Sequence, residues 1–352
     1  KMLGFFMSKD LISRLNEGPV LCAEGYLFAM ERRGYLQAGP FVPEVVLEHP
    51  EVVTQLHREF IRAGSDVVQA FTYYGHREKL RIIGKENLLE PLQKNALKIA
   101  HEVTKEFPKL DLLICGDVAN TNIFDPSDKN SRKECQKMFE EQVMWAKEAK
   151  VNFIVAETIS WVEEMKIALK TIKDAGLIAV TNFAIPRGDK TRDGYSAEDA
   201  CKMMEDLGSD VVGLNCYRGP ETTITLLEKI RKKVSCHVAG LPVPYRTTEK
   251  DPTFLNIKDD GCNCIPGGNA FPVALDNFLC NRYEMAEFAK NCVNKKINFI
   301  GICCGAAAHH VREMSIAIGK KPISYKYSPD MSKHFHHGTD PSLKKVNKEI
   351  KY

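Results

Sequence analysis

The sequence predicts an α/β protein, a single (β/α)8 barrel of the TIM type followed by a C-terminal extension. Short apolar runs that alternate with helical patterns indicate a parallel sheet with crossover helices. Eight such units fit within about 300 of the 352 residues, as a closed barrel requires. No Gly-x-Gly-x-x-Gly motif follows the first apolar run, which argues against an open dinucleotide-binding sheet. We expect the barrel to span residues 1–318 and the extension to span 319–352.

Each expected strand is short and apolar, and a helical pattern follows it. Strands are predicted at 19–23, 67–72, 110–118, 153–156 (ending on Glu157), 177–182, 211–215, 236–241 and 297–303. Helices are predicted at 9–15, 50–63, 88–107, 132–149, 161–174, 196–207, 221–234, 281–294 and 310–318. Ser196 is a typical N-cap and Gly176 a typical C-cap. Loops rich in Gly and Pro are expected after the first strand and at 242–272.

The composition excludes several classes of function. The net charge is +3, with 49 basic and 46 acidic residues well interspersed, so no strong attraction to nucleic acid is expected. No apolar run approaches the ~20 residues of a membrane-spanning helix, so no membrane partner is expected. The 12 cysteines are scattered through apolar segments of a large chain, which indicates a reducing, cytoplasmic setting.

Two cysteine motifs stand at predicted strand ends. Cys303 and Cys304 end the eighth strand, and Cys216 ends the sixth. Adjacent cysteines do not easily bond to each other, because a vicinal disulfide is strained. Three thiolates without an obvious fourth protein ligand are typical of a zinc site that keeps one position open for substrate. The alternative is that these cysteines are small buried hydrophobic residues, as most free cysteines are.

The barrel brings these motifs together. The C-terminal ends of all eight strands converge on one face, where active sites of such barrels lie. The polar residues expected at these ends are Glu24, Tyr74, Glu157, Asn215, Cys216, Cys303 and Cys304. Strands six and eight lie close to each other across the barrel mouth, so the convergence favours a zinc site over three unrelated cysteines.

The chain resembles the homocysteine S-methyltransferase family. Gly-x-Asn-Cys at 213–216 and Gly-x-Cys-Cys-Gly at 301–305 are similar to the zinc motifs of that family. Four further stretches resemble its betaine–homocysteine branch, at 28–35, 38–40, 55–64 and 69–74. The resemblance covers about residues 19–318, nearly the whole barrel.

The resemblance implies a zinc-dependent enzyme of methionine biosynthesis that transfers a methyl group from betaine or S-methylmethionine to homocysteine. The zinc ligands it implies are Cys216, Cys303 and Cys304, with Asn215 and His310 behind them. Glu157 matches the glutamate that binds the substrate amino group, although a charge at a helix N-terminus is the alternative. Tyr74 matches a tyrosine near the metal, with a packed aromatic as the alternative.

The chain departs from the family at the end of the first strand and at two positions that affect the methyl donor. The family pattern Asp-Gly-Gly at the end of the first strand is Ala23-Glu24-Gly25 here, so a side chain is expected to crowd the substrate amino acid. Phe41 stands where the betaine branch has tryptophan, and Thr158 stands where it has tyrosine. Aromatic faces hold quaternary ammonium groups, so weaker betaine binding is expected, which favours S-methylmethionine as the alternative donor.

Two other functions remain as alternatives. The first is a diverged barrel that lost or altered its activity and acts as a binding or structural protein. The second is a zinc-thiolate enzyme that acts on another small thiol. Members of the betaine branch carry a longer C-terminal arm than this chain does, and they use it in oligomer assembly. Their tetramer is therefore not expected to carry over, and a homo-oligomer of another kind stays open.

Overall fold

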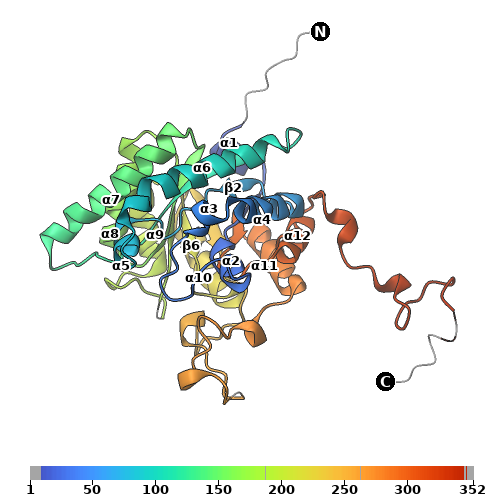
Figure 1. The fold of residues 1–352 in the computed structure, drawn as a ribbon. Coiled ribbons are helices and arrows are strands. Elements are labelled where there is room, and N and C mark those ends of the chain that lie inside the picture. The colour runs from blue at the N-terminus through green and yellow to red at the C-terminus, as the bar shows by residue number, and fades with distance from the viewer. Residues whose placement is uncertain (1–8, 187, 262, 345, 347–352) are drawn as a thin grey trace, which may run out of the picture.

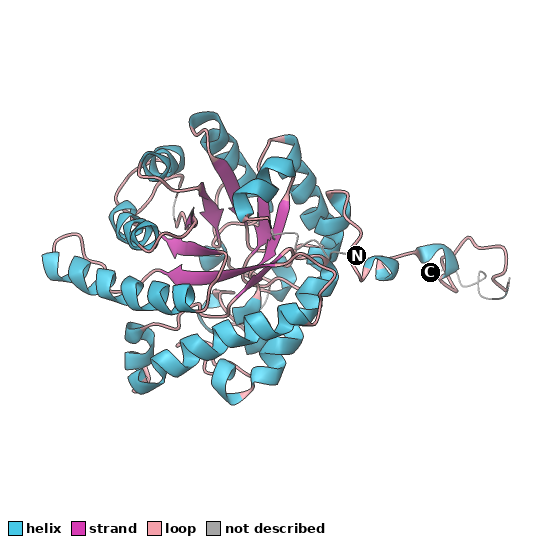
Figure 2. Ribbon diagram, turned by 90° about the horizontal axis from the view of Figure 1, so that it is seen from above, coloured by secondary structure: helices cyan, strands magenta, loops and turns pink. Residues whose placement is uncertain are grey.

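The computed structural model describes residues 9–186, 188–261, 263–344 and 346. Eight parallel strands pair in sequence order, and the eighth pairs with the first, so the sheet closes into a barrel. Figure 2 shows the strands at the centre and the helices around them. The predicted (β/α)8 barrel is confirmed.

The strands lie close to their predicted positions. They are β1 (Val20–Ala23), β2 (Val67–Gln69), β3 (Leu113–Ala119), β4 (Phe153–Ile159), β5 (Ala179–Phe183), β6 (Val211–Asn215), β7 (His237–Leu241) and β8 (Phe299–Ile302). β4 is longer than predicted, because it continues past Glu157 through an irregularity between Ala156 and Ile159. β2 and β8 are shorter than predicted, so Tyr74, Cys303 and Cys304 lie in the loops that follow them.

Twelve α-helices lie within the described residues. They are α1 (Leu11–Glu17), α2 (Tyr26–Arg32), α3 (Val45–Glu48), α4 (Pro50–Ala63), α5 (Arg77–Ile82), α6 (Leu89–Lys105), α7 (Lys129–Glu148), α8 (Val162–Asp174), α9 (Ala197–Asp206), α10 (Pro220–Lys233), α11 (Arg282–Asn294) and α12 (Ala308–Ala317). The sequence did not predict α2, α3 and α5. α2 is fixed by burial of its Tyr26, Leu27 and Met30, a tertiary effect that outweighs its weak helical pattern.

The barrel interior has two halves, and both follow the two-residue period of the strands. The lower half is a buried cluster closed at its base by α1; its members include Val20, Cys22, Cys115, Phe153, Val155, Val180, Val211, Ala239 and Phe299, with Leu11 and Leu15. The next inward positions towards the carboxyl ends of the strands are polar and form the barrel mouth: Glu24, Gln69, Asp117, Glu157, Asn182, Asn215 and Cys303.

After α12 the chain leaves the barrel (Figure 1). Its first residues are held against the barrel wall, since Lys320 forms an ion pair with Asp66 and the amide of Ser324 donates to the carbonyl of Arg62 at 2.9 Å. Beyond them the segment extends away from the barrel (Figure 1). No helix among the described residues is long and apolar enough to cross a membrane.

Candidate metal and substrate site

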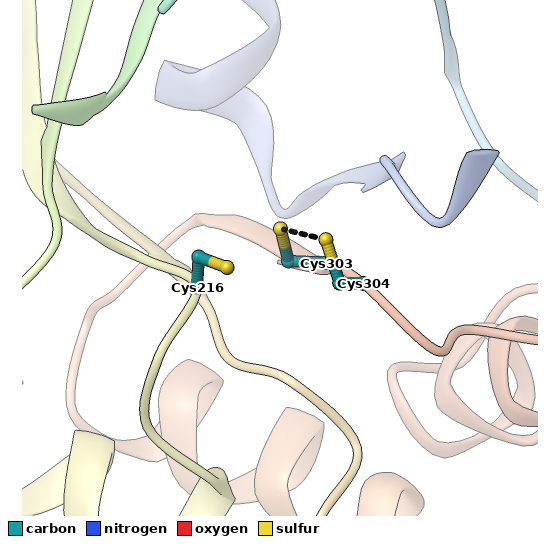
Figure 3. Close-up of side chains that lie close together, drawn as sticks. All are labelled: Cys216, Cys303 and Cys304. Atoms are coloured by element: carbon teal, nitrogen blue, oxygen red, sulfur yellow. Dashed lines mark hydrogen bonds between the residues drawn. The ribbon is translucent and has the colours of Figure 1, made fainter. Parts of the chain in front are cut away.

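The three predicted cysteines meet at the barrel mouth. The Sγ atoms of Cys216, Cys303 and Cys304 all lie within 4.8 Å of one another, and all three residues are buried. Figure 3 shows Cys216 reaching from the end of β6 towards the adjacent pair after β8. Cys303 and Cys304 are free thiols whose sulfurs are 3.9 Å apart, well beyond the ~2 Å of a disulfide bond.

The end of β7 holds both cysteine segments. The amide of Cys216 donates to the carbonyl of Leu241 at 3.0 Å, and the amide of Cys303 donates to the carbonyl of Pro242 at 2.9 Å. Cys216 has a φ of 56°, and Tyr217 has a φ of 55°. Residues other than glycine rarely adopt this left-handed backbone conformation, and those that do cluster at functional sites. From this turn the Cys216 thiol points towards the adjacent cysteine pair (Figure 3).

The donor set fits a zinc ion. A tetrahedron with Zn–S bonds of ~2.3 Å has edges of ~3.8 Å, and the Cys303–Cys304 separation is 3.9 Å. Hydrogen bonding to Cys303 and Cys304 raises the pKa of the Cys216 thiol well above its usual value. Hydrogen bonding from Cys216 and Cys303 lowers the pKa of the Cys304 thiol to about 5. The cluster therefore holds one thiolate readily near neutral pH, and ionisation of all three thiols requires a cation among them.

Glu157 lies beside the sulfurs and is firmly held. It is buried, and its two oxygens accept hydrogen bonds from Gln69 Nε2 at 2.7 Å and Asn215 Nδ2 at 2.6 Å. Asn215 Nδ2 also lies 3.9 Å from Cys303 Sγ, so this side chain links the carboxylate to the thiol cluster. The alternative of Glu157 as a charge at a helix N-terminus is not supported, because its carboxylate bonds to side chains inside the barrel.

Glu24 points into the mouth. Its carboxylate is buried without a hydrogen-bond partner, and one of its oxygens lies within 4.8 Å of a Glu157 oxygen and of Cys303 Sγ. Gly25 packs against the loop after the cysteine pair, where an added Cβ would lie 2.4 Å from Ala306 Cβ. A glycine is therefore required at position 25, while the space that the family motif leaves at position 24 is filled by an acidic side chain.

The three remaining substrate positions share a backbone feature. Phe41, Tyr74 and Thr158 have φ values of 54°, 60° and 57°. The Thr158 amide donates to Asn215 Oδ1 at 2.8 Å. The Tyr74 ring packs on Tyr73, with ring centroids 4.2 Å apart, and burial raises the pKa of its hydroxyl.

Two aromatic faces near the mouth are already covered. The ammonium nitrogen of Lys79 lies 4.0 Å from the centroid of the Tyr74 ring. The Phe41 ring is stacked on Phe28 with centroids 5.9 Å apart, and it is buried. These contacts leave less free aromatic surface for a quaternary ammonium group than the residue types alone suggest.

His310 supports the loop after the cysteine pair and makes no contact with sulfur that the structure records. Its Nδ1 accepts from the amide of Ala307 at 3.3 Å, so its Nε2 carries the proton and donates to the carbonyl of Cys280 at 2.9 Å. Burial lowers the pKa of this imidazole to about 4.

Three polar residues of the mouth were not singled out from the sequence: Gln69, Asp117 and Asn182. Asp117 and Asn182 are buried, and their side-chain oxygens and the Asn182 amide nitrogen have no hydrogen-bond partner. A signal was present, because all three stand at the inward positions of otherwise apolar strands. Counting two residues at a time along each strand would have found them.

Comparison with known proteins agrees with the family resemblance of the sequence motifs. A family model described as homocysteine S-methyltransferase matches residues 27–318. Betaine–homocysteine S-methyltransferase 1 of Danio rerio is 34% identical over 311 residues, covering 87% of this chain and 75% of the relative. S-methylmethionine–homocysteine S-methyltransferase BHMT2 of Pongo abelii is 30% identical over 314 residues, covering 87% and 80%.

Among solved structures, the metallated form of the homocysteine methyltransferase MmuM from Escherichia coli superposes with a TM-score of 0.68. It is 15% identical and covers 87% of this chain and 99% of its own. At this identity the likeness supports the barrel fold.

Proposed function

The chain belongs to the homocysteine S-methyltransferase family, and we propose that it is a zinc-dependent enzyme that methylates homocysteine to methionine. The observation that carries the proposal is the set of three buried thiols within 4.8 Å of one another at the barrel mouth. A structural role for these thiols would not need the strained turn at Cys216 or the adjacent carboxylate of Glu157.

Cys216, Cys303 and Cys304 would hold the zinc ion, which fits three soft ligands with one open position. When bound, zinc would take the thiol of homocysteine at that position and lower its pKa, so that a thiolate attacks the methyl group. Asn215 holds the backbone of Thr158 and the carboxylate of Glu157 in fixed positions beside the sulfurs. Glu157 would accept hydrogen bonds from the substrate ammonium group.

The methyl donor is betaine or S-methylmethionine. Both carry the methyl group on a positively charged atom, the quaternary nitrogen of betaine or the sulfonium sulfur of S-methylmethionine. As a thiolate forms a bond to the methyl carbon, the bond from that carbon to the charged atom breaks, and the donor leaves as a neutral tertiary amine or thioether. The reaction therefore removes charge from the site, which a buried mouth favours. Because Lys79 covers the Tyr74 ring and Phe41 packs on Phe28, we expect S-methylmethionine to be the better donor.

The direct test uses the full chain, purified under reducing conditions and loaded with zinc. Methionine formation from homocysteine is measured with betaine and with S-methylmethionine in separate reactions. Turnover with either donor, lost on removal of zinc by a chelator, supports the proposal. No turnover with either donor in protein that holds one zinc per chain would contradict it.

One observation favours a second candidate acceptor, another small aminothiol. The cavity beside Cys303, lined by Glu24, Tyr26, Gln69 and Glu157 among others, has room for only about one water molecule. Homocysteine requires this wall to move, whereas a smaller thiol requires less movement. Offering cysteamine in the same assay separates the two acceptors.

A further inference from the structure

A second cavity lies at the start of α10, between the loops that follow β5 and β7. Its volume is about 440 Å3, which is within the usual range of small-molecule sites. None of the described residues that line it also lines the small cavity beside Cys303. We call it the Arg218 cavity, after the buried basic side chain in its wall, and the proposed function makes no use of it.

Arg218 is buried in this wall without a hydrogen-bond partner. It is only 6% exposed, and its Nε and Nη2 atoms form no hydrogen bond with any described residue. Asp189 attracts the guanidinium group, but it forms its ion pair with Lys229, at 3.4 Å. Because an arginine keeps its charge in a protein, a buried and unpaired one is costly to the fold. Such a group calls for an explanation, and a negatively charged ligand would supply the missing partner.

The backbone around Arg218 is firmly held. Its amide donates to the carbonyl of Cys216 at 2.6 Å, and its carbonyl accepts from the amide of Val243 at 2.9 Å. Gly219 is the N-cap of α10, and an added Cβ there would lie 1.9 Å from the carbonyl oxygen of Tyr245. Arg218 therefore enters the cavity from a rigid turn beside the positive end of the α10 dipole, which favours a negative group.

A carboxylate fits the Arg218 cavity better than a phosphate does. Its two oxygens match the fork of a guanidinium group. Three acidic side chains, which we call the acidic rim, line the same cavity and are partly or fully exposed: Asp189, Glu221 and Glu249. They repel a phosphate, which has more negative charge than a carboxylate. A ligand that carries a positive group beside its carboxylate is attracted both by Arg218 and by the acidic rim.

We propose that the Arg218 cavity binds a zwitterionic amino acid. The carboxylate of the ligand pairs with Arg218, and its ammonium group faces the acidic rim. Leu226 and Pro252 also line the cavity, so an apolar side chain on the ligand fits it best. The proposal goes beyond the proposed function, because this ligand lies apart from the zinc ligands and undergoes no reaction.

Calorimetry on the zinc-loaded full chain tests the proposal with L-norleucine, a zwitterion with an apolar side chain and no sulfur. We expect one equivalent of norleucine whose affinity falls about 10-fold or more in Arg218→Gln, since hydrogen bonds to charged groups are the strong ones. The same equivalent should be retained in Glu157→Gln, which changes the barrel mouth. It should also be retained in Arg62→Gln, which changes an exposed arginine of α4.

Two analogues separate the charges of the ligand. Hexanoate lacks the ammonium group and norleucine amide lacks the carboxylate, so both should bind more weakly than norleucine. Glu249→Lys reverses one exposed charge of the acidic rim. This change should weaken norleucine binding by about 3-fold, as expected for an exposed charge, and it should strengthen hexanoate binding.

Three results would overturn the proposal. The first is the absence of norleucine binding, or equal binding to Arg218→Gln and to the parent chain. The second is a response of norleucine and hexanoate to Glu249→Lys in the same direction. The third is tighter binding of inorganic phosphate than of norleucine. If Arg218→Gln melts at a lower temperature than the parent chain, the responses to Glu249→Lys decide, because that exposed position makes no buried contact that folding needs.

Discussion

The two halves of the barrel interior contrast sharply. In the lower half Cys22, Cys115 and their apolar neighbours fill the space between strands, and α1 closes the base. In the mouth the same inward positions carry acidic and amide groups, several without partners, and left-handed backbone is found at Cys216 and Thr158. The lower half therefore stabilises the fold. The unpaired groups and strained turns of the mouth reduce that stability, and they are the groups that a substrate can contact.

The contrast also separates two kinds of cysteine. Burial raises the pKa of the Cys22 and Cys115 thiols, which pack as small hydrophobic groups. Cys304 has a lowered pKa because its two sulfur neighbours donate to it. Cys22 and Cys115 also face each other, so the difference lies in the number of sulfurs: the cluster of three lowers the pKa of one of its members, and the pair does not.

The largest expected effect is that of Cys303→Ala. This change removes one of three ligands, so we expect the loss of stoichiometric zinc and of all methyl transfer. Metal content after dialysis, measured by atomic emission, checks it. Cys22→Ala is the matched control, since the same change in the lower half should leave one zinc per chain. Full zinc occupancy in Cys303→Ala would show that the ligand assignment is wrong.

The next effect is on stability. Phe153→Ala opens a cavity in the fully buried lower half and should reduce the free energy of unfolding by about 3–5 kcal/mol. Asn182→Ala in the mouth should reduce it far less, because neither polar atom of Asn182 has a hydrogen-bond partner to lose. Denaturant unfolding of both variants measures the difference. Equal losses of unfolding free energy in Phe153→Ala and Asn182→Ala would contradict the distinction between the two halves.

The smallest effect is a pH dependence at the wall of the mouth. His57 is buried on α4 beside the hydroxyl of Tyr26, 3.1 Å from its Nδ1, and burial lowers the pKa of His57 to about 3. The unfolded chain takes up the proton below pH ~6.5 and the folded chain does not, so stability falls as the pH falls through this window. At pH 5 the loss is ~2 kcal/mol.

Thermal unfolding at pH 7 and pH 5 tests this dependence. Between pH 7 and pH 5 the melting temperature of His57→Gln should fall less than that of the parent chain. The melting temperature of His49→Gln, which changes an exposed position, should fall as much as that of the parent. An unchanged drop in His57→Gln would assign the acid sensitivity to other groups.

Much of this contrast follows from the sequence. The strand count alone is enough to bring the cysteines together, because eight strands in a closed barrel force the ends of strands six and eight to the same face. Asp117 was missed because it lies within an apolar run, where strand periodicity and not residue type reveals its direction. α2 depends on burial of Tyr26 and Leu27 by distant segments, which local pattern does not report.

The turn at Thr158 was out of reach for a different reason. A β-branched residue rarely adopts a positive φ, so local propensity argues against the observed conformation. The hydrogen bond from its amide to Asn215, a residue 57 positions away, helps to hold it there. Strain of this kind is set by tertiary contacts and so is absent from any local signal.

The central claim is that the mouth cysteines hold zinc with one position open to the acceptor thiol. X-ray absorption at the zinc edge tests it most directly, because it counts the sulfur atoms at ~2.3 Å from the ion. We predict three sulfur neighbours in the zinc-loaded chain and four after homocysteine is added. A sulfur count that stays at three with homocysteine bound, or four sulfurs before it is added, would contradict the claim.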